Sequence, residues 1–390
     1  MQFGIDAISF YTSKYYLDLA AFAKARGMEL AKLKELGQVK MAMPALGEDV
    51  ITLAANSVDQ LLAERDTARI ALVIFATESG VDQAKSAAAY IHRWFELSSQ
   101  CRIIELKQAC YSATCGLQLA LTWLKANPTQ QVLLVAADVA RYAENSAAEI
   151  SQGCGAVALL LSANPSLLVI SGDAGVCTRE VMDFWRPNYL DYALVDGRLS
   201  CDNYIRSAIE SFQQYSRISG RKFEEHDRFC YHMPFAKLVQ RTHRHLAKTN
   251  GVEGQKSLSP DWLEESLIYG KEIGNCYTAS LYLGILSLLE NSSEELSGKL
   301  LGLYSYGSGS TAEFLSAQVV PGYKDYLPTT KLGDLLTRRI SLSFDDYLKL
   351  HAGSGLSSGE VMIDPAAAWQ TGKFRLIGIK QHQRIYERSR

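Results

Sequence analysis

Three residues of this chain have the type and the position to carry nucleophilic and acid–base chemistry. Cys110 lies where a predicted strand passes into a predicted helix, and the positive end of a helix is expected to lower the pKa of a thiol there. Glu78 ends an apolar strand, where apolar surroundings raise a carboxyl pKa and suit a general base. His232 follows a short apolar run, and a buried imidazole requires hydrogen-bond partners. A thiol nucleophile and a carboxylate base are together typical of covalent catalysis.

Each of these residues also has a structural interpretation that the sequence leaves open. A free cysteine is most often a small buried apolar residue. The glutamate is equally an acid near a helix start or a surface charge, and the histidine is equally a satisfied core residue. Cys115 lies further along the same predicted helix, and we expect it in the core.

A glycine–serine turn, Gly307–Ser310, follows another predicted strand. Such turns expose backbone N–H groups that bind anions or oxyanions. The turn lacks the lysine of a P-loop and the spacing of G-x-G-x-x-G, so a nucleotide site is not supported. Lys237, Arg241 and Arg244 follow His232 closely. They are interpreted either as a phosphate-binding group or as an exposed basic helix face.

Apolar runs alternate with helix-like segments along the chain. Strands are predicted at Ile70–Ala76, Cys101–Leu106, Gln131–Ala137, Ala156–Leu161, Arg228–Tyr231, Lys299–Tyr306 and Phe374–Ile379. Helices are predicted at 84–97, 111–126 and 275–290. Continuous apolar strands separated by helices predict a parallel sheet that is covered on both faces.

Two similar pentapeptides each open a Leu-rich predicted helix: Cys110–Thr114 (CYSAT) and Cys276–Ser280 (CYTAS). A repeat at about half of the chain length predicts two similar halves rather than a solenoid. Between them, Cys177–Arg221 is rich in Asp, Tyr and Arg. This segment is interpreted as an excursion from the sheet that lines a site or an interface.

Composition argues against several classes of protein. Forty basic and 42 acidic residues give a net charge of −2, without the basic excess of a nucleic-acid-binding domain. No apolar run approaches the ~20 residues of a membrane span, and no signal-peptide pattern opens the chain, so we expect a cytoplasmic protein. Eight cysteines without a C-x-x-C pair predict reduced thiols and no metal site. The histidines expected at the surface are His92, His226, His243, His245, His351 and His382.

Eight strings, in order along the chain, carry a resemblance to one family. They are ATESGVD at 76–82, ELKQACYSAT at 105–114, NSAAEISQGCGAVA at 145–158, DFWRP at 183–187, LVDGRLS at 194–200, FCYHMPFAK at 229–237, GNCYTASLYL at 274–283 and YGSGSTAEF at 306–314. With them the chain resembles the 3-hydroxy-3-methylglutaryl-CoA synthases of the thiolase superfamily, most strongly the bacterial form. The resemblance implies an α/β fold of two pseudo-symmetric βαβαβαβ halves in a layered αβαβα core. We expect the halves at 1–165 and 166–390, the second with an inserted segment at about 177–221.

The resemblance also implies roles for individual residues. Cys110 matches the acetyl-carrying cysteine, Glu78 the general acid/base and His232 the histidine that orients the acetoacetyl group. The matched substrate- and CoA-binding positions are Asn275, Ser308, Ser151, Tyr142, Lys237 and Arg241. Ser151 stands where close relatives often have Thr, and Arg241 stands where Lys is common, which keeps the charge but changes the geometry.

The implied reaction condenses acetyl-CoA with acetoacetyl-CoA and water to give 3-hydroxy-3-methylglutaryl-CoA and CoA, in the mevalonate pathway. It requires no metal or redox cofactor, and a homodimer is expected. A polyketide β-branching synthase that acts on acyl carrier proteins is the alternative within the family, because ELKQACYS and the tail resemble that branch. DFWRP, LVDGRLS and GYKDYL favour the mevalonate branch. Outside the family, a thiolase-fold ketosynthase and a non-catalytic acyl-binding protein stay open.

Overall fold

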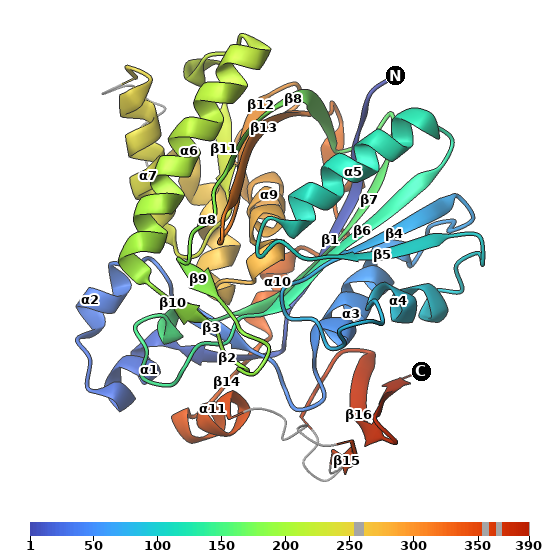
Figure 1. Cartoon of the computed structure of the whole chain (residues 1–390), viewed down its shortest axis with the longest axis vertical. Coiled ribbons are helices and arrows are strands. Elements are labelled where there is room, and N and C mark those ends of the chain that lie inside the picture. Colours follow the sequence, from blue (N-terminus) through green and yellow to red (C-terminus); the bar gives the residue numbers. More distant parts are fainter. Residues whose placement is uncertain (253–260, 353–358, 364–368, 390) are drawn as a thin grey trace.

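A nine-stranded mixed sheet forms the centre of the protein (Figure 1). The computed structural model describes residues 1–252, 261–352, 359–363 and 369–389, and the sheet is counted within them. In spatial order its strands are β11 (Arg228–Tyr231), β12 (Leu300–Gly307), β13 (Thr311–Val319), β8 (Leu168–Thr178), β1 (Phe3–Tyr11), β7 (Cys154–Ala163), β6 (Gln131–Val139), β4 (Ile70–Ala76) and β5 (Arg102–Leu106).

The sheet contains the same four-stranded arrangement twice. In the first copy β4 and β6 are parallel, β6 and β7 are antiparallel, and β7 and β1 are antiparallel. The second copy repeats this pattern with β11 and β12, β12 and β13, and β13 and β8. The copies join where β1 pairs antiparallel with β8. Gly4 is needed at this junction, because a Cβ there would lie 1.9 Å from the carbonyl oxygen of Leu168.

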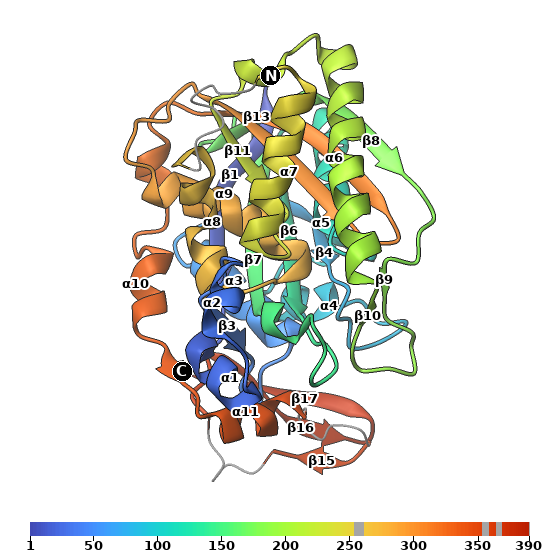
Figure 2. The same ribbon diagram turned by 90° about the vertical axis from the view of Figure 1, so that its left-hand side faces the viewer.

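Helices cover both faces of this sheet in layers. In Figure 1, α3 (Val50–Leu62) and α4 (Ala88–Trp94) lie on one side of the N-terminal strands and α5 (Ser112–Ala126) on the other. In the second half, α6 (Gly197–Ser219) packs on β8 and β13, and α9 (Ser280–Asn291) packs on β11 and β12. Helix α7 (Ala236–Thr249) runs beside α6 on the outside (Figure 2). The layered two-half α/β architecture is therefore confirmed.

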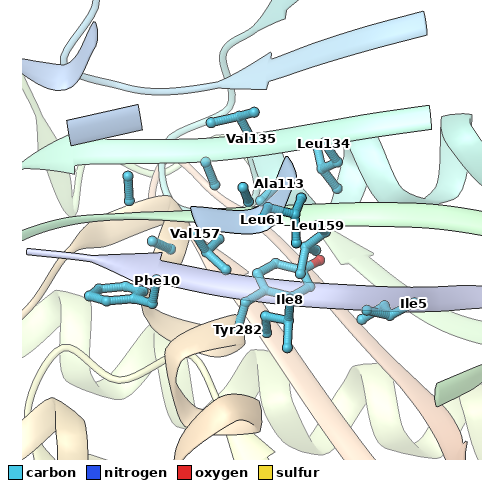
Figure 3. Close-up of a cluster of buried hydrophobic side chains, with 14 of the residues drawn as sticks. Ile5, Ile8, Phe10, Leu61, Ala113, Leu134, Val135, Val157, Leu159 and Tyr282 are labelled. Atoms are coloured by element: carbon cyan, nitrogen blue, oxygen red, sulfur yellow. The ribbon is translucent and has the colours of Figure 1, made fainter. Parts of the chain in front are cut away.

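The core lies where the two halves meet. Helix α3 is buried nearly all round, with 11 of its 13 residues buried, as expected of a helix between a sheet and a covering layer. Figure 3 shows apolar side chains of β1, β6 and β7 meeting those of α5 and of Tyr282 in α9. The Tyr282 hydroxyl lies 3.1 Å from Thr114 Oγ1, so the helices opened by the two pentapeptides touch each other in the middle layer.

The C-terminal residues pack against the N-terminal half. Strand β14 (Ile340–Ser341) pairs with β2 (Tyr15–Asp18), which also pairs with β3 (Lys40–Met43). Strands β15 (Val361–Met362), β16 (Phe374–Lys380) and β17 (Gln383–Arg388) form a separate small sheet beside α3. The remaining elements are α1 (Leu19–Arg26), α2 (Leu30–Lys34), α8 (Asp261–Ile273), α10 (Leu332–Thr337), α11 (Phe344–His351), the short strands β9 (Phe184–Trp185) and β10 (Leu194–Val195), and the 3₁₀ turns at 149–151, 223–225, 277–279 and 323–326. The tail thus packs on the first half, and the division of the chain into halves at 1–165 and 166–390 stays a prediction.

Three further expectations are corrected. The sheet is mixed rather than parallel, because β7 and β13 return as antiparallel strands. The segment 177–221 is an excursion only as far as residue 196, since α6 follows. The polar composition of α6 concealed an inward stripe of Tyr204, Ala208, Phe212 and Tyr215 at helical spacing.

The histidines His226 and His243 are buried at 1% exposure rather than at the surface, because aromatic rings enclose them.

The eight cysteines are all unpaired, as predicted, although Cys115 is only partly buried. None of the described helices combines the length and the apolar character needed to cross a bilayer. Within the described residues, no group of three or more His, Cys, Asp or Glu side chains is arranged to hold a metal ion.

Asp49 joins the start of α3 to the C-terminal strands. Its Oδ1 accepts hydrogen bonds from the backbone N–H groups of Ile51 (3.1 Å) and Thr52 (2.9 Å). Its Oδ2 accepts hydrogen bonds from Arg384 Nη1 (3.0 Å) and the Tyr386 hydroxyl (2.8 Å). One carboxylate thus caps a nearly fully buried helix and fixes the C-terminal hairpin on it.

We expect Asp49→Ala to lower the free energy of unfolding by about 2–3 kcal/mol, because a helix cap and two side-chain hydrogen bonds are lost together. Urea unfolding measures the loss. Asp18→Ala is the control: it removes a cap of the surface helix α1, where Asp18 accepts only from Ala20 N–H (2.7 Å), and should cost about 1 kcal/mol or less. Equal losses in the two variants would contradict this role of Asp49.

Candidate active site

Cys110 lies in a tight turn between β5 and α5. The preceding residue, Ala109, has φ 45°, a left-handed backbone conformation that is unfavourable for a residue with a Cβ. The turn is held by Ser112, whose Oγ donates to the Ala109 carbonyl oxygen at 2.8 Å. Gly307, at the end of β12, packs so closely on the turn that a Cβ would lie 2.5 Å from the Gln108 carbonyl oxygen. The second half of the chain therefore supports the turn that presents the thiol.

The structure brings Cys110 and Glu78 together. The Cys110 Sγ donates a hydrogen bond to Glu78 Oε1 at 3.0 Å. Burial and then the negative charge of Asp138 raise the pKa of Glu78 to about 8, although the thiol and Arg186 act in the opposite direction. Burial and then Glu78 raise the pKa of Cys110 well above its usual value. The expected lowering of the thiol pKa is wrong, because desolvation and a neighbouring carboxylate outweigh the helix N-terminus.

Asp138, at the end of β6, organises this pair and was missed by the sequence analysis. Its carboxylate is fully buried and accepts from Thr77 Oγ1 (2.9 Å) and from the Glu78 backbone N–H (2.9 Å). It also accepts from the N–H (3.1 Å) and the hydroxyl (2.5 Å) of Thr278, which follows Cys276 in the second pentapeptide. A buried charge needs such a full set of partners, and here the set joins the two halves of the chain.

His232 follows β11, the strand beside β12. Its side chain is 2% exposed, and its backbone is fixed on both sides, by the Tyr304 carbonyl oxygen (2.7 Å) and the Tyr204 hydroxyl (2.5 Å). Burial lowers the pKa of His232 to about 3, so the ring is neutral. Its buried Nδ1 has no hydrogen-bond partner among the described residues. The ring is therefore held in place with one nitrogen available to a bound molecule.

Aromatic rings surround the thiol. Cys110 packs in one buried cluster with Tyr142 and Tyr277, and Phe184 packs against it. The three rings meet edge to face, with centroids 5.6–6.3 Å apart. The Tyr277 hydroxyl is buried and interacts with the Tyr142 side chain. This cluster forms an apolar wall with a polar tip beside the Cys110–Glu78 pair.

The other predicted binding residues divide into two groups. Asn275 is 4% exposed, and its side-chain oxygen accepts from Tyr277 N–H at 2.9 Å. Ser151 is partly buried, and its carbonyl oxygen accepts from Asn275 N–H at 2.9 Å. Ser308 lies in the β12–β13 turn and lines a cavity of about 1100 Å³ together with Glu78. Ser308 thus shares a cavity with Glu78 and Tyr142 packs with Cys110, whereas Asn275 and Ser151 are joined to this region through Tyr277.

Lys237 and Arg241 form the second group. Both are exposed on α7, one turn apart, where Lys237 Nζ lies 2.9 Å from Glu35 Oε2 and Arg241 Nη2 lies 4.0 Å from Asp202 Oδ1. Neither residue contacts Cys110, Glu78 or His232 in the described part of the chain. Neither residue lines the cavity beside Glu78, and their role in binding CoA stays a prediction.

Sequence reasoning missed Asp138, Asp183, Arg186 and Tyr277. Asp138 follows the apolar run of β6, as Glu78 follows the apolar strand β4. This shared position of an acid at the end of an apolar strand was the available signal. Asp183 and Arg186 lie in the string DFWRP, which was used only for the resemblance. Tyr277 lies inside CYTAS, and nothing in its residue type separates it from the other core tyrosines.

Comparison with known proteins identifies the class and then the family. The duplicated sheet, with a cysteine at the start of a central helix and a carboxylate at the end of a neighbouring strand, is that of a thiolase-like enzyme. The family model described as hydroxymethylglutaryl-coenzyme A synthase N terminal matches residues 1–166, and the C-terminal model matches residues 171–261 and 252–351. The chain belongs to the hydroxymethylglutaryl-CoA synthase family.

Individual relatives agree with this assignment. The chain is 39% identical to the hydroxymethylglutaryl-CoA synthase of Enterococcus faecalis over 354 residues, which covers 90% of this chain and 92% of the relative. It is 32% identical to the polyketide-biosynthesis 3-hydroxy-3-methylglutaryl-ACP synthase of Bacillus subtilis, over 90% of this chain and 89% of the relative. A solved HMG-CoA synthase complexed with CoA superposes with a TM-score of 0.94 at 36% identity, and each chain is covered fully.

The low pKa of His232 gives a direct test. We expect the ring resonances of His232 to stay unchanged between pH 8 and pH 5, because a group whose pKa is about 3 takes up no proton in that range. Two-dimensional NMR of the free enzyme measures this, and His232→Asn identifies the resonances. By linkage, this group favours the unfolded chain as pH falls below its ordinary pKa of 6.5. A titration midpoint near 6 would refute the assigned environment.

Proposed function

We propose that the protein condenses acetyl-CoA with acetoacetyl-CoA and water, through acetyl-Cys110, to give 3-hydroxy-3-methylglutaryl-CoA and free CoA. The observation that carries the proposal is the 3.0 Å hydrogen bond between Cys110 Sγ and Glu78 Oε1. A carboxyl group of raised pKa in contact with a nucleophile is able to take two protons in succession, first from the thiol and then from the methyl group of the acetyl-enzyme. Family membership and the solved relatives with bound CoA and 3-hydroxy-3-methylglutaryl-CoA support this choice of substrates.

The first step forms the acetyl-enzyme. The ionised Glu78 takes the thiol proton of Cys110, and the sulfur attacks the thioester carbonyl of acetyl-CoA. The bond from the carbonyl carbon to the CoA sulfur breaks, and CoA leaves as a thiol after it receives a proton. Since the thiol pKa is high, the contact with Glu78 is what makes Cys110 nucleophilic near neutral pH.

The second step forms the new carbon–carbon bond. Glu78 removes a proton from the methyl group of acetyl-Cys110, and the resulting carbanion attacks the ketone carbon of acetoacetyl-CoA. The ketone oxygen becomes a hydroxyl as it takes up a proton. The neutral His232, with one buried nitrogen free of protein partners, orients and polarises that ketone.

The third step releases the product. Water attacks the thioester carbonyl at Cys110, the carbon–sulfur bond breaks, and the acyl group leaves as a carboxylate while the thiol is restored. The steps are an acyl transfer, a carbon–carbon addition and a hydrolysis with accompanying proton transfers, without a change of net oxidation state, so the proposed reaction uses no redox cofactor and no metal ion. Asn275, Ser308, Ser151 and Tyr142 line the acyl end of the site, and Lys237 and Arg241 meet the phosphates of CoA.

The same proposal includes the setting of the enzyme. We infer a cytoplasmic homodimer that binds neither nucleic acid nor membrane. The edge strand β5 supports the dimer, because Ile103 and Ile104 are 39% and 44% exposed there and an unpaired apolar edge favours association. Light scattering after size-exclusion chromatography distinguishes a dimer from a monomer.

We expect Cys110 alone to gain one acetyl group when the enzyme is incubated with acetyl-CoA, measured by mass spectrometry of its peptides. Cys110→Ser should lower turnover at least about 10³-fold, and Cys115→Ser should change little. Acetylation of several cysteines alike, or of none, would contradict the proposal.

Glu78→Ala should separate the two half-reactions. Acetyl-Cys110 should still form, but more slowly, because the thiol loses its base while the negative charge that helps to raise its pKa is lost as well. Condensation should fall at least about 10³-fold, because no group removes the methyl proton. Rapid quench of acetylated enzyme mixed with acetoacetyl-CoA measures it. Glu105→Ala is the control, since this carboxylate lines the same cavity from β5. Full condensation by Glu78→Ala would instead favour a ketosynthase or thiolase.

A competition assay decides between the two acyl carriers. We expect acetoacetyl-CoA to be preferred over acetoacetyl-carrier protein, because identity is higher to the CoA-dependent relative from Enterococcus faecalis (39%) than to the ACP-dependent one from Bacillus subtilis (32%). The measured quantity is the ratio of kcat/KM values. A strong preference for the carrier-bound substrate would assign the enzyme to polyketide β-branching.

A further inference from the structure

We propose that Arg186 is a positioning residue for Glu78: from the second half of the chain, its guanidinium fixes the Glu78 peptide and brings a positive charge to the base. The inference deepens the proposed function and rests on it. Arg186 belongs to the string DFWRP, which the described mechanism does not otherwise use. It joins the segment 179–196 to the base itself through a hydrogen bond to the Glu78 carbonyl oxygen.

The strand that carries Arg186 is anchored independently of Glu78. Arg186 directly follows β9, which pairs with β10 in a small hairpin. Asp183, just before β9, is fully buried. Its Oδ2 accepts from the Tyr306 hydroxyl (2.6 Å) and its Oδ1 from Gly309 N–H (2.9 Å). The hairpin is thus attached to the end of β12 and β13, and Arg186 extends from it toward the first half.

The Glu78 peptide is held from both sides. Arg186 Nη2 donates a hydrogen bond to the Glu78 carbonyl oxygen. On the other side, the Glu78 N–H donates to Asp138 Oδ1 at 2.9 Å. A carboxylate on β6 and a guanidinium from the hairpin therefore set the direction of the Glu78 side chain, which in turn meets Cys110. A planar guanidinium suits this task better than an ammonium group, because its donors have a fixed geometry.

Arg186 also supplies charge where the base needs it. Asp82, Lys85, Glu105, Lys107 and Asp191 line the cavity beside Glu78. Within the described residues, the titratable groups that interact electrostatically with Glu78 itself are Asp138 on β6, Cys110 before α5, Tyr142 after β6, Tyr277 after Cys276, and Arg186. Among them only Arg186 is a cation, and it opposes burial and Asp138, which both raise the pKa of Glu78.

Its charge is not cancelled by a direct partner. Across the described ranges, Arg186 forms no ion pair with a carboxylate. Arg141 lies near enough to be repelled by Arg186. Burial lowers the pKa of Arg141, Asp191 raises it, and the positive charge of Arg186 lowers it further. The guanidinium lines the same cavity as Glu78. Its positive charge consequently acts on the base rather than on a neighbouring acid.

The test is the pH dependence of the condensation step, measured by rapid quench on acetyl-Cys110 enzyme mixed with acetoacetyl-CoA. Arg186→Gln removes the positive charge, so the pKa of Glu78 rises. The acidic limb of the rate–pH profile should therefore move to higher pH by about one pH unit. Because Glu78 acts as a base when ionised, the rate at pH 7 should fall about tenfold. The KM for acetoacetyl-CoA should stay unchanged, since Arg186 acts through Glu78. Arg186→Lys keeps the charge and should leave the limb in place while kcat falls.

Lys107→Gln is the matched control, because it removes a cation from the same cavity that does not touch Glu78; its profile should equal that of the wild type. An unmoved limb in Arg186→Gln, or an equal shift in Lys107→Gln, overturns the proposal. If Arg186→Gln does not fold, a shift of about one unit in Arg186→Lys overturns it as well. These outcomes leave the proposed function intact, whereas full condensation by Glu78→Ala would remove the function itself.

Discussion

The hydrogen bond between the Cys110 thiol and the Glu78 carboxylate is the interaction on which the rest of the structure depends. Placing both groups out of water disfavours the charged form of each; the carboxylate raises the pKa of the thiol further, whereas the hydrogen bond from the thiol lowers the pKa of Glu78. That environment suits a base that must gain and lose protons near neutral pH. It also requires a support that fixes both groups, because a buried pair with loose geometry would lose the contact that activates the thiol.

The duplicated fold supplies this support in an asymmetric way. The first half contributes Cys110 and Glu78, and the second half contributes His232, the Thr278 donors to Asp138, and the Gly307 contact with the cysteine turn. The equivalent cysteine of the second half, Cys276, is fully buried and serves packing. Duplication therefore gave two similar helix starts, of which one presents a nucleophile and the other closes the site from behind. Arg186 and Asp138 add opposite charges at the two ends of the Glu78 peptide.

Much of this arrangement follows from the sequence. Apolar runs marked the strands β4, β6, β11 and β12, and the two pentapeptides marked the repeat. The position of Cys110 between a strand and a helix was predicted correctly, because strand-to-helix turns are recognisable in a sequence. Strand direction was not predicted correctly, because a continuous apolar run looks the same in a parallel and in an antiparallel strand. Helix α6 was not predicted, because its buried face includes tyrosines and serines. The pKa of Cys110 and the roles of Asp138 and Arg186 depend on contacts across 28 to 108 residues, which spacing alone does not encode.

The central claim is that Glu78 acts on the acetyl group carried by Cys110. Hydrogen–deuterium exchange into the methyl group of acetyl-Cys110 tests it most directly, without acetoacetyl-CoA present. The acetylated enzyme is placed in deuterated buffer, and mass spectrometry of the acetylated peptide follows the incorporation of deuterium. The account predicts incorporation in the wild type and none above the solvent background in acetylated Glu78→Gln. Equal exchange in both enzymes would show that another group removes the proton and would contradict the account.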